Sequence, residues 1–430
     1  MQSPTVIATV GGEGTRLYPL TLNQTKALVD ICDKATLSIL FEVLARQHCN
    51  RFIIASKGSE NTTQLNKYFK TGEGFFSRLN LPLGDFKYQP NYEDNGSGDS
   101  VRFCMEHYDI REDVMVVGGD NVLDMDIKPL MEFHKKTGAI ATVVLKELSS
   151  EEDISQFGVA KISNENRIIK FVEKPRHGSE PSRLINTAVY IFSPEIREVF
   201  KKMGDKVKDI GHDVIPYLTE NDYPVYGYLL DGYWADVGTP EQLLKTTIDV
   251  LDGKIKHGKF KYECEYAEGQ CVYSTTLEQI KKQIETGDLK LKGNVFLARD
   301  CRIGKNVEIE HSYIGHTSII KDGVKIKDSA IMSFANIGSN VKINKAILGR
   351  YTTVQDNSVI DADLPIEFEG GSTSMERIPV IGGGGVVISK RSVIGPGKRV
   401  APIKYSHQIL STGKFIELGM DQRNVYFMAK

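Results

Sequence analysis

The sequence predicts two structural classes in series: an α/β domain built on a mostly parallel sheet, and a parallel β-solenoid after it. In roughly the first 250 residues, short apolar runs alternate with amphipathic helical patterns, as in α/β proteins. From Ile303 onward, aliphatic residues instead recur every five or six positions. The length of 430 residues exceeds one ordinary core, so we expect domains at residues 1–250 and 295–430, joined by a connector at 251–294.

Composition excludes several classes of protein. Apolar residues make up 40% and charged residues 26% of the chain, as in soluble globular proteins. The formal net charge of −2 provides no basic field for nucleic acid, and no apolar run reaches the ~18 residues of a membrane-spanning helix. The six cysteines lack the C-x-x-C spacing of zinc sites, and no secretory signal is visible. We therefore expect a cytoplasmic protein with reduced thiols that binds neither nucleic acid nor a membrane.

The stretch that follows the first expected strand is glycine-rich and basic. The apolar run 6–10 predicts a buried strand, and three glycines within the next four residues end it abruptly. Ligands bind at such carboxyl ends of parallel strands, and glycines leave backbone N–H groups uncovered. With the positive charges of Arg16 and Lys26, the loop suits a polyanion such as a triphosphate. Leu17 stands where dinucleotide-binding loops and P-loops both need glycine, so the spacing excludes those two motifs.

The full string from residue 11 to 21, GGEGTRLYPLT, is more specific than its glycines, and Lys26 follows after a short spacer. It resembles the signature of the sugar-1-phosphate nucleotidylyltransferases, the nucleotide-sugar pyrophosphorylases. The resemblance implies a Rossmann-like sheet domain, a left-handed β-helix, Mg²⁺ as cofactor, and an NTP and a sugar 1-phosphate as substrates. It also implies catalytic roles for Arg16 and Lys26, and nucleotide binding by Gly11, Gly12, Gly14 and Thr15. Two positions depart from the family pattern, because Thr25 and Ala35 stand where the family commonly has proline.

The elements after the loop alternate between helix and strand, as in successive βαβ units. We expect helices at 37–45, 62–69, 100–108 and 127–136, and strands at 51–55, 86–88, 114–117 and 139–146. The string GSGDSV at 96–101 resembles the family segment that contacts base and ribose. That resemblance implies nucleotide contacts for Gln89, Gly96 and Ser97. From the residues alone, a loop with a helix cap explains the same stretch, because Ser and Asp favour helix starts.

Two distant aspartates are candidate metal ligands. Asp120 follows an apolar strand and two glycines, and Asp236 stands in the string GYWADVGTP at 232–240. Magnesium needs only one or two protein carboxylates, because phosphate oxygens and water complete its shell. The resemblance implies that Asp120 and Asp236 bind Mg²⁺, although a turn aspartate is the simpler interpretation of Asp120 alone. We expect Asp124 and Asp126 in a loop, and a helix that starts at Thr239 with a proline after its cap.

A strand, turn and strand pattern at 157–162 and 167–175 carries the candidate sugar site. The strings FGVAKI and RIIKFVEKP resemble the segment that packs on the sugar in the family. The resemblance implies sugar contacts from Gly158, Glu173 and Asn186, and a catalytic role for Lys174 at the sugar phosphate. A solvated Glu–Lys pair is the alternative. Ala188 stands where the family usually has glycine. At 209–216 we expect a helix start rather than a catalytic Asp–His pair.

The second half of the chain repeats. Its aliphatic residues follow spacings of six, five and six, so that three short edges make one coil. This is the pattern of a hexapeptide-type β-solenoid. The series comprises Ile303, Ile309, Ile314, Ile320, Ile326, Ile331, Ile337, Ile343, Leu348 and Val354. A further coil at Ile381, Val387, Val393 or Ile394, and Val400 follows a polar stretch at 367–376. We expect a helix in the connector at 275–286. Only the family resemblance implies a left-handed coil.

These observations predict an enzyme that makes an NDP-sugar and pyrophosphate from an NTP and a hexose 1-phosphate. The segments at 157–175 and 209–216 look most like glucose-1-phosphate adenylyltransferases, so we favour glucose 1-phosphate. The string LVDIC at 28–32 looks more like mannose-1-phosphate guanylyltransferases, and a catalytically silent regulatory subunit is the third alternative. In related enzymes the solenoid is usually regulatory or oligomeric, and we expect a dimer or tetramer formed through it. Acetyl transfer, with His311, His316 or His407 as base, is the alternative role.

Overall fold

The computed structural model describes residues 3–12, 14–17, 20–21, 24–90, 93–258, 265–267, 270–272, 277–362, 386–388, 393–397 and 399–400. The chain divides into two compact units. Unit 1 comprises residues 1–12 and 37–236, and unit 2 comprises residues 13–36 and 237–430. The segment that contains Lys26 therefore groups with the solenoid. Within the described residues, no helix has the length and apolar character needed to cross a membrane.

Unit 1 is built on one large sheet. Its first strands, β1 (Thr5–Val10), β4 (Arg51–Ser56), β5 (Asp85–Tyr88) and β6 (Val114–Gly118), lie parallel in the order β6-β1-β4-β5. Beyond β6 the sheet becomes mixed. There β11 (Leu184–Phe192) runs antiparallel to β6, β8 (Ala141–Glu147) and β9 (Gly158–Ile162), β9 pairs with β10 (Ile168–Glu173), and β12 (Val225–Leu229) pairs with β8. The predicted α/β class is confirmed, and the parallel strands are those expected before residue 120.

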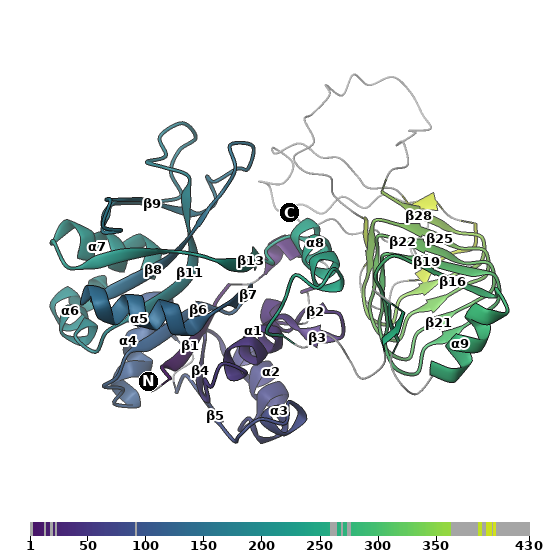
Figure 1. Cartoon of the computed structure of the whole chain (residues 1–430), viewed down its shortest axis with the longest axis horizontal. Coiled ribbons are helices and arrows are strands. Elements are labelled where there is room, and N and C mark those ends of the chain that lie inside the picture. Colours follow the sequence, from purple (N-terminus) through teal and green to yellow (C-terminus); the bar gives the residue numbers. More distant parts are fainter. Residues whose placement is uncertain are drawn as a thin grey trace. The chain divides into compact units, whose positions relative to one another are not determined.

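The helices of unit 1 are those that connect these strands. They are α1 (Thr36–Ala45), α2 (Ser59–Phe69), α3 (Glu73–Arg78), α4 (Ser97–His107), α5 (Ile127–Thr137), α6 (Ile196–Met203) and α7 (Ile215–Glu220), with the short turns η3 (Gly204–Lys206) and η4 (Ile210–Val214). Figure 1 shows α4, α5 and α6 beside the sheet. Apolar residues of β1, β6, β8 and β11 pack with those of α4 and α6 into one core. In open α/β sheets, ligands bind at the carboxyl ends of the parallel strands, so the candidate site is sought there.

Two details of unit 1 differ from the sequence prediction. Helix α4 begins at Ser97, three residues before its predicted start, because the amides of Gly98 and Asp99 both donate to the Lys208 carbonyl and fix the first turn. The expectation that Asp124 lies in a loop was wrong. Residues 121–125 form a strand, β7 (Asn121–Met125), that pairs antiparallel with β13 (Gly232–Asp236), and Asp124 is buried in it. A strand whose only partner lies about a hundred residues away leaves little local signal.

Unit 2 is a parallel β-helix with three faces, seen as stacked coils in Figure 1. One face comprises β14 (Glu265–Ala267), β15 (Gln270–Val272), β17 (Val295–Leu297), β20 (Tyr313–Ile314), β23 (Ala330–Ile331), β26 (Ala346–Leu348) and β29 (Val386–Ile388). The second comprises β16 (Leu289–Lys292), β19 (Val307–Glu310), β22 (Lys325–Lys327), β25 (Lys342–Asn344), β28 (Val359–Asp361) and β31 (Arg399–Val400). The third comprises β18 (Arg302–Ile303), β21 (Ile319–Ile320), β24 (Asn336–Ile337), β27 (Thr353–Val354) and β30 (Val393–Ile394).

The predicted coil length is confirmed by the strand register. Ile303 pairs with Ile320, Ile320 with Ile337, and Ile337 with Val354, so that each partner lies one predicted coil further along the chain. These aliphatic side chains fill the interior of the coils. The further coil is also confirmed, since β29, β30 and β31 pair with the coil before them. Ile381 and the polar stretch at 367–376 lie outside the described residues.

The corners of the coils use the left-handed backbone region. Asp300, Thr317, Phe334 and Tyr351 have φ values of 59°, 58°, 63° and 62°, and each lies one coil after the one before. The other two corners repeat in the same way, with Asn306, Gly323, Asn340 and Asn357 at one and His311, Asp328 and Lys345 at the other. A residue in this conformation turns the chain sharply. The residue before each corner therefore occupies the same place on every coil.

The remaining elements of unit 2 lie at the end and on one face of the solenoid. Helix α9 (Leu277–Glu285) confirms the predicted connector helix, and its Ile280 joins the solenoid core. Helix α8 (Pro240–Leu251) contacts both β26 and the hairpin strand β2 (Asp30–Ile31). The hairpin is completed by β3 (Lys34–Ala35). Outward-facing Phe296, Tyr313, Ala330 and Ile347 of this face are buried, whereas the outward residues of the β19–β22 face are mostly charged.

Candidate active site

The two candidate metal ligands meet at one end of the β7–β13 ribbon in unit 1. Asp236 is the last residue of β13 and pairs with Asn121, the first residue of β7. Asp120 directly precedes Asn121. Paired residues of an antiparallel ribbon have Cα atoms about 4.5–5.5 Å apart, so the two aspartates come from neighbouring backbone positions although they lie far apart in the sequence.

One backbone carbonyl anchors both strands of this ribbon. The carbonyl oxygen of Thr187, in β11, accepts a hydrogen bond of 2.8 Å from Asn121 Nδ2 and another of 3.0 Å from Trp234 Nε1. Both bonds are buried. Because both lone pairs of the oxygen are used, the ends of β7 and β13 are held against the large sheet at one point. The anchor fixes the two aspartates without using any charged group.

Two glycines bring the end of β6 close to its neighbours. A Cβ atom on Gly119 would lie 2.6 Å from Val10 Cγ2 and 3.2 Å from the Thr9 carbonyl oxygen. The Gly119 amide donates to that same carbonyl at 2.9 Å. A Cβ atom on Gly118 would lie 2.9 Å from Asn121 Nδ2. There is no room for a side chain at position 119, so this pair of glycines sets the place of Asp120.

A second carboxylate group lies on the predicted sugar side. Glu173, the last residue of β10, is surrounded by glycine backbone: Cβ atoms on Gly158 and Gly211 would lie 2.6 Å and 2.8 Å from its Oε2. Burial raises the pKa of the Glu173 carboxyl, and the charge of Lys174 opposes that rise. The Lys174 ammonium lies 3.8 Å from Glu173 Oε1 and is well exposed. A half-buried carboxylate beside an exposed lysine can accept hydroxyl hydrogen bonds and pair with a phosphate.

The segment of β11 next to the Thr187 anchor is irregular. Asn186 pairs with Leu145 and Tyr190 with Val143, so two extra residues of β11 bulge out. Asn186 bridges the bulge, because its Nδ2 donates to the Tyr190 hydroxyl at 2.7 Å and its Oδ1 accepts from the Ala188 amide at 3.0 Å. Ala188 has φ +56°, in the left-handed region that favours glycine. Within this bulge, the Thr187 carbonyl faces the β7–β13 ribbon, where it accepts from Asn121 and Trp234.

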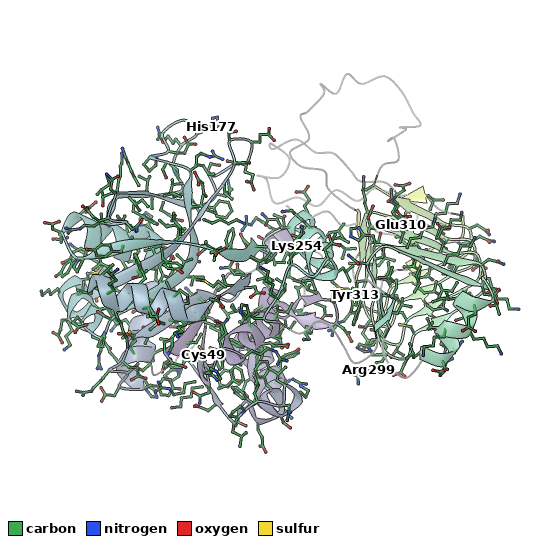
Figure 2. The ribbon with its side chains drawn as sticks, in the orientation of Figure 1. Cys49, His177, Lys254, Arg299, Glu310 and Tyr313 are labelled. Carbon is green, nitrogen blue, oxygen red and sulfur yellow. The ribbon has the colours of Figure 1, made fainter. Side chains whose placement is uncertain are left out.

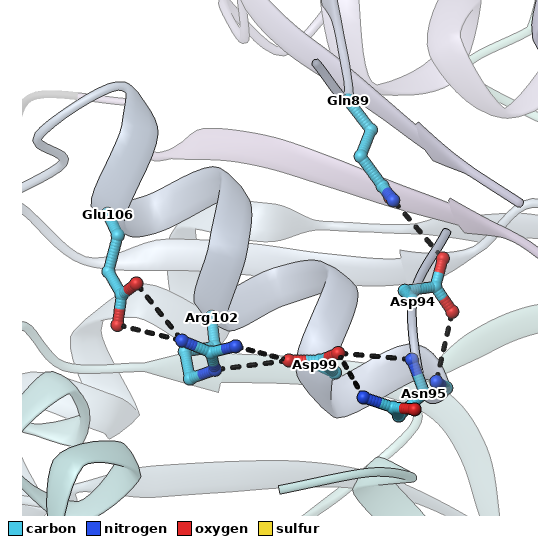
Figure 3. Close-up of polar contacts among 7 residues, drawn as sticks. Gln89, Asp94, Asn95, Asp99, Arg102 and Glu106 are labelled. Atoms are coloured by element: carbon cyan, nitrogen blue, oxygen red, sulfur yellow. Dashed lines mark hydrogen bonds and ion pairs between the residues drawn. The ribbon is translucent and has the colours of Figure 1, made fainter. Parts of the chain in front are cut away.

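The predicted base-binding residue heads a polar network, shown in Figure 3. Gln89 is 2% exposed, and its Nε2 donates to Asp94 Oδ2 at 3.2 Å. Its buried Oε1 has no hydrogen-bond partner among the described residues. The other Asp94 oxygen accepts from the Gly96 amide at 2.9 Å. A buried acceptor with no partner costs free energy, so Gln89 Oε1 is suited to meet a ligand donor.

Further along this network, charged side chains stabilise the first turns of α4. The Asn95 amide and side chain both donate to Asp99 Oδ2, and Arg102 donates to Asp99 Oδ1 at 2.6 Å and 3.1 Å. Arg102 also pairs with Glu106 (Figure 3). Burial alone would raise the pKa of the Asp99 carboxyl, but the hydrogen bonds from Arg102 and Asn95 outweigh burial and lower it. Asp99 is thus an ionised structural group.

Ser97 and Gly96 serve the backbone junction beside this network. The Ser97 hydroxyl donates to Asp209 Oδ2 at 2.8 Å and accepts from the Ile210 amide at 3.0 Å. A Cβ atom on Gly96 would lie 2.9 Å from the Lys208 carbonyl oxygen. Asp209 caps η4, accepting from the His212 amide, so the predicted helix start is confirmed. These contacts hold the segment before η4 against the start of α4.

The signature loop at residues 11–21 belongs partly to each unit, because unit 1 includes residues up to Gly12 and unit 2 begins at residue 13. In unit 1, Gly11 and Gly12 follow β1 and are exposed, and Gly12 has φ +93°. In unit 2, the loop closes on itself: the Thr21 hydroxyl donates to the Gly14 carbonyl at 2.7 Å, and a Cβ atom on Gly14 would lie 3.3 Å from Lys26 Cβ. Thr15 and Arg16 form the turn η1 (Thr15–Leu17), with Arg16 exposed.

The lysine of the signature starts its own short turn, η2 (Lys26–Leu28). Thr25, the residue before it, has φ −60° and ψ 142°. This is the conformation that proline favours, so the departure from the family pattern at Thr25 leaves the backbone in the same region. Thr36 closes the segment, since its amide and hydroxyl both bond the Val29 carbonyl, at 3.0 Å and 2.9 Å.

The donor set at the β7–β13 ribbon fits Mg²⁺. Asp120 and Asp236 offer hard carboxylate oxygens from adjacent positions. Magnesium is often bound by one or two protein carboxylates, so this pair is sufficient. In the part of the chain that the structure describes, no three His, Cys, Asp or Glu side chains gather as a possible metal cage. An ion at these two aspartates would therefore take further oxygens from substrate phosphate and water.

Sequence reasoning missed the groups that position the site. The Asn121 side chain donates to the Thr187 carbonyl and so anchors the ribbon, and neither group was predicted to have a role. Lys146 also supports it, because its ammonium donates to the Trp234 carbonyl at 3.1 Å and lies 5.4 Å from the centre of the Trp234 ring. The only available signal was that Asn121 follows Asp120 and that Trp234 is the sole tryptophan.

Comparisons with known proteins identify the family of the chain. Residues 5–253 match the family model described as nucleotidyl transferase, and residues 291–405 match the model described as GMPPB C-terminal domain. The chain is 27% identical over 360 residues to a UTP--glucose-1-phosphate uridylyltransferase of Synechocystis sp., covering 81% of this chain and 88% of that protein. It is 26% identical over 405 residues to the glucose-1-phosphate adenylyltransferase small subunit of Triticum aestivum, covering 81% and 82%.

A third relative shares mainly the first part of the chain. The glucose-1-phosphate adenylyltransferase of Desulforamulus reducens is 30% identical over 251 residues, which covers 57% of this chain and 59% of that protein. The nucleotidyl transferase model itself spans more than half of the 430 residues. The chain therefore belongs to the nucleotidyl transferase family, and the family resemblance of its motifs is confirmed.

Proposed function

We propose that the protein makes an NDP-sugar and pyrophosphate from an NTP and a hexose 1-phosphate, most simply glucose 1-phosphate. One observation carries the proposal: Asp236 pairs with Asn121, so that its carboxylate and that of Asp120 leave neighbouring backbone positions in a chain of the nucleotidyl transferase family. The relatives named for uridylyl and adenylyl transfer to glucose 1-phosphate support the choice of sugar.

The reaction asks for positioning and charge neutralisation more than for covalent chemistry. An oxygen of the sugar phosphate attacks the α-phosphorus of the NTP in line, and pyrophosphate leaves from the opposite side. We assign the β- and γ-phosphates to Arg16 and to the loop amides of Gly11, Gly12, Gly14 and Thr15. We assign Lys26 to the charge that develops during transfer, and Lys174 to the sugar phosphate that attacks. Held charges of this kind lower a barrier because they need no reorganisation during the reaction.

The divalent ion of this reaction would be Mg²⁺, held by Asp120 and Asp236. When bound, it neutralises charge on the α-phosphate and the sugar phosphate, which lets two anions approach. The role of the protein is to keep both carboxylates on one side of the reacting atoms. The uncharged anchor at the Thr187 carbonyl supports this role, since it does not compete for the ion.

Other residues are assigned to the sugar and to the base. Glu173 and Asn186 would accept hydrogen bonds from sugar hydroxyls, with the Gly158 backbone beside them. The unsatisfied Oε1 of Gln89 would accept from an N–H of the base, and the Gly96–Ser97 turn would hold the ribose side. Such an acceptor suits an exocyclic amino or a ring N–H group, and both purine and pyrimidine bases carry one. We further propose a cytoplasmic homo-oligomer formed through the solenoid.

The test is pyrophosphate release from the wild-type chain across the common NTPs, each with glucose 1-phosphate and mannose 1-phosphate. We expect one pair to exceed the others, with glucose 1-phosphate as the preferred sugar; preference for mannose 1-phosphate with GTP would replace the sugar assignment. Asp236→Asn should lower turnover by at least about a hundredfold while the unfolding midpoint changes little. Asp231→Asn, which removes an exposed carboxylate just before the same strand, is the matched control.

Two outcomes would contradict the proposal. Undiminished turnover in Asp236→Asn would remove this residue from the mechanism. A wild-type protein that releases no pyrophosphate with any pair would favour a silent regulatory subunit instead.

A further inference from the structure

A group of buried and half-buried polar and charged side chains in unit 2 has no part in the proposed chemistry. It joins the β2–β3 hairpin to the solenoid, and we name it the hairpin–solenoid cluster: Asp30, Asp33, Tyr313, His316, Ser333 and Arg350. Arg350 Nε donates to Asp30 Oδ2 at 2.7 Å, and Arg350 Nη2 lies 2.5 Å from the same oxygen. Asp33 Oδ1 accepts from Ser333 at 3.1 Å and from Tyr313 at 3.4 Å, with His316 Nε2 3.8 Å away.

The solenoid side of this cluster follows the coil repeat. Arg299, His316, Ser333 and Arg350 lie one coil apart from each other in turn, and each directly precedes a left-handed corner residue. Because successive parallel strands stack about 4.8 Å apart, these four side chains form one row across four coils. Arg299 and Tyr313 are labelled on the solenoid in Figure 2. The row offers two guanidiniums, an imidazole and a hydroxyl to the two carboxylates of one hairpin.

Burial makes this arrangement specific. Asp30 is 6% exposed and Tyr313 is 1% exposed. Burial raises the pKa of the Asp30 carboxyl, and the charge and hydrogen bonds of Arg350 oppose that rise. A buried ion pair adds little net stability compared with apolar packing, yet removal of one partner leaves a buried charge alone. Loss of Arg350 would leave the buried Asp30 carboxylate without its guanidinium partner, so the place of the hairpin depends on this contact.

The hairpin is connected rigidly to Lys26. Asp30 lies four residues after Lys26, and hydrogen bonds cover the interval: the Leu28 amide donates to the Thr25 carbonyl, and the Val29 amide to the Lys26 carbonyl. Thr36 bonds Val29 from the other side of the hairpin. Residues 27–32 are all buried. A shift of Asp30 must therefore move the backbone of Lys26, which lies so near Gly14 that a Cβ atom on Gly14 would be 3.3 Å from Lys26 Cβ.

We propose that Arg350, acting through Asp30, is a positioning residue for Lys26, so that the solenoid sets the place of this lysine. The proposal rests on the proposed function for its kinetic consequence, but not for its structural one. The solenoid then acts on the reaction through the position of Lys26. A change in the coil that carries Arg350 would change that position. Arg350 itself touches no reacting atom.

The kinetic test compares Arg350→Met with the wild type. We expect kcat/KM for the NTP to fall by about tenfold or more, because small misplacement of a catalytic group is costly, while KM for the sugar phosphate stays nearly constant. Arg350→Lys should recover part of the loss, since it restores the charge without the bidentate geometry. Lys327→Met is the matched control, because it breaks the 2.8 Å Lys327–Glu310 pair on another face of the same solenoid.

A double variant distinguishes misplacement of Lys26 from unfolding of the protein. Asp30→Asn combined with Arg350→Met removes both charges and leaves no buried carboxylate without a partner. We expect this double variant to melt near the wild type and to regain part of the NTP efficiency lost in Arg350→Met. An equal rise in KM for the NTP and for the sugar phosphate, with no recovery in the double variant, would overturn the positioning role and leave Arg350 as a structural residue.

Hydrogen exchange of the backbone amides of residues 26–36 separates this inference from the proposed function. We expect Arg350→Met to speed exchange across this segment by about tenfold or more, and Lys327→Met to leave it unchanged. Unchanged exchange in folded Arg350→Met would overturn the proposal whatever the activity. If the wild type has no activity with any substrate pair, the proposed function fails, while the exchange result still decides whether Arg350 holds the segment.

Discussion

The two groups of candidate catalytic residues are held in place by different physical means. In unit 1, Asp120 and Asp236 are positioned by close backbone packing at Gly119 and by two neutral hydrogen bonds to the Thr187 carbonyl. In unit 2, Lys26 belongs to a segment that is held to the solenoid by the ion pair between the buried Asp30 carboxylate and the partly exposed Arg350 guanidinium. Salt and pH scarcely alter the position of groups held by neutral packing, such as the two aspartates. The position of a group held by an ion pair, such as Lys26, depends on the protonation of that pair and on salt.

The largest effect is expected where packing leaves no space. Gly119→Ala would place a methyl group 2.6 Å from Val10 Cγ2, so the end of β6 must move and carry Asp120 with it. We predict a fall in kcat of about a hundredfold, since displacement of about 1 Å is enough for that loss. Steady-state pyrophosphate release measures it.

Gly74→Ala is the control for that substitution. Gly74 lies in α3, and a Cβ atom added there would have nothing within 4 Å, so activity should be kept and the helix slightly stabilised. Full activity in Gly119→Ala would show that the position of Asp120 tolerates a shift of the β6 end.

The sugar side of unit 1 should be the next most sensitive. Gly211→Ala would bring a methyl group 2.8 Å from Glu173 Oε2, and the flexible carboxylate must turn away. We predict a rise of about tenfold in KM for the sugar phosphate, with little change in KM for the NTP, because one charge-assisted hydrogen bond is lost. Initial rates with each substrate varied in turn measure this. An equal rise for both substrates would contradict the assignment of Glu173 to the sugar.

A gain in stability is expected at the β11 bulge. Ala188 has φ +56°, a conformation that costs an L-residue roughly 1–2 kcal/mol and costs glycine little. Ala188→Gly should therefore raise the free energy of unfolding by up to about 1 kcal/mol after the added backbone entropy of glycine is counted. Ala160→Gly, in regular strand β9, should instead lower it. Chemical denaturation of both variants gives the comparison, and destabilisation by Ala188→Gly would show that the methyl group packs usefully.

The smallest effect concerns charge in unit 2. His311 Nδ1 lies 2.9 Å from Asp328 and its Nε2 lies 3.0 Å from Asp252. Burial opposes protonation of His311, but the two carboxylates outweigh burial and raise its pKa. A raised folded-state pKa gives stability that is fully present below the unfolded value of about 6.5 and is lost as pH rises through the folded value.

Thermal unfolding of the wild type and His311→Gln between pH 5.5 and pH 9, values chosen to bracket a histidine pKa of about 6.5, should show this dependence. The wild type should be the more stable by at most about 1 kcal/mol at the acid end, because the pair is partly exposed, and the difference should shrink as pH rises. A difference that grows with pH would reverse the sign of the interaction.

The sequence predicted the parts of the fold that have a local period. Alternating apolar runs and helical patterns identified the α/β sheet, and the regular aliphatic spacing identified the coils, because each coil repeats one backbone path. Strand β7 was missed, since five residues with a partner about a hundred positions away leave no period to find.

The sequence named candidate site residues, but it did not reveal the groups that position them. The resemblance named Asp120 and Asp236; in the structure Asp236 pairs with Asn121, the residue after Asp120, and their role as metal ligands stays a prediction. The Thr187 carbonyl could not be found, because a backbone acceptor leaves no mark on the sequence. The row from Arg299 to Arg350 is visible as a regular spacing once the coil length is known, but its carboxylate partners Asp30 and Asp33 come from a segment about 300 residues earlier.

The most direct test of the account is Mn²⁺ binding, measured by electron paramagnetic resonance in the presence of a non-hydrolysable NTP. Mn²⁺ substitutes for Mg²⁺ at oxygen ligands and reports binding without turnover. We predict that the wild type and Asp231→Asn bind equally, and that Asp120→Asn and Asp236→Asn each bind at least about tenfold more weakly. Equal Mn²⁺ affinity in all four proteins would contradict a shared metal site at the end of the β7–β13 ribbon.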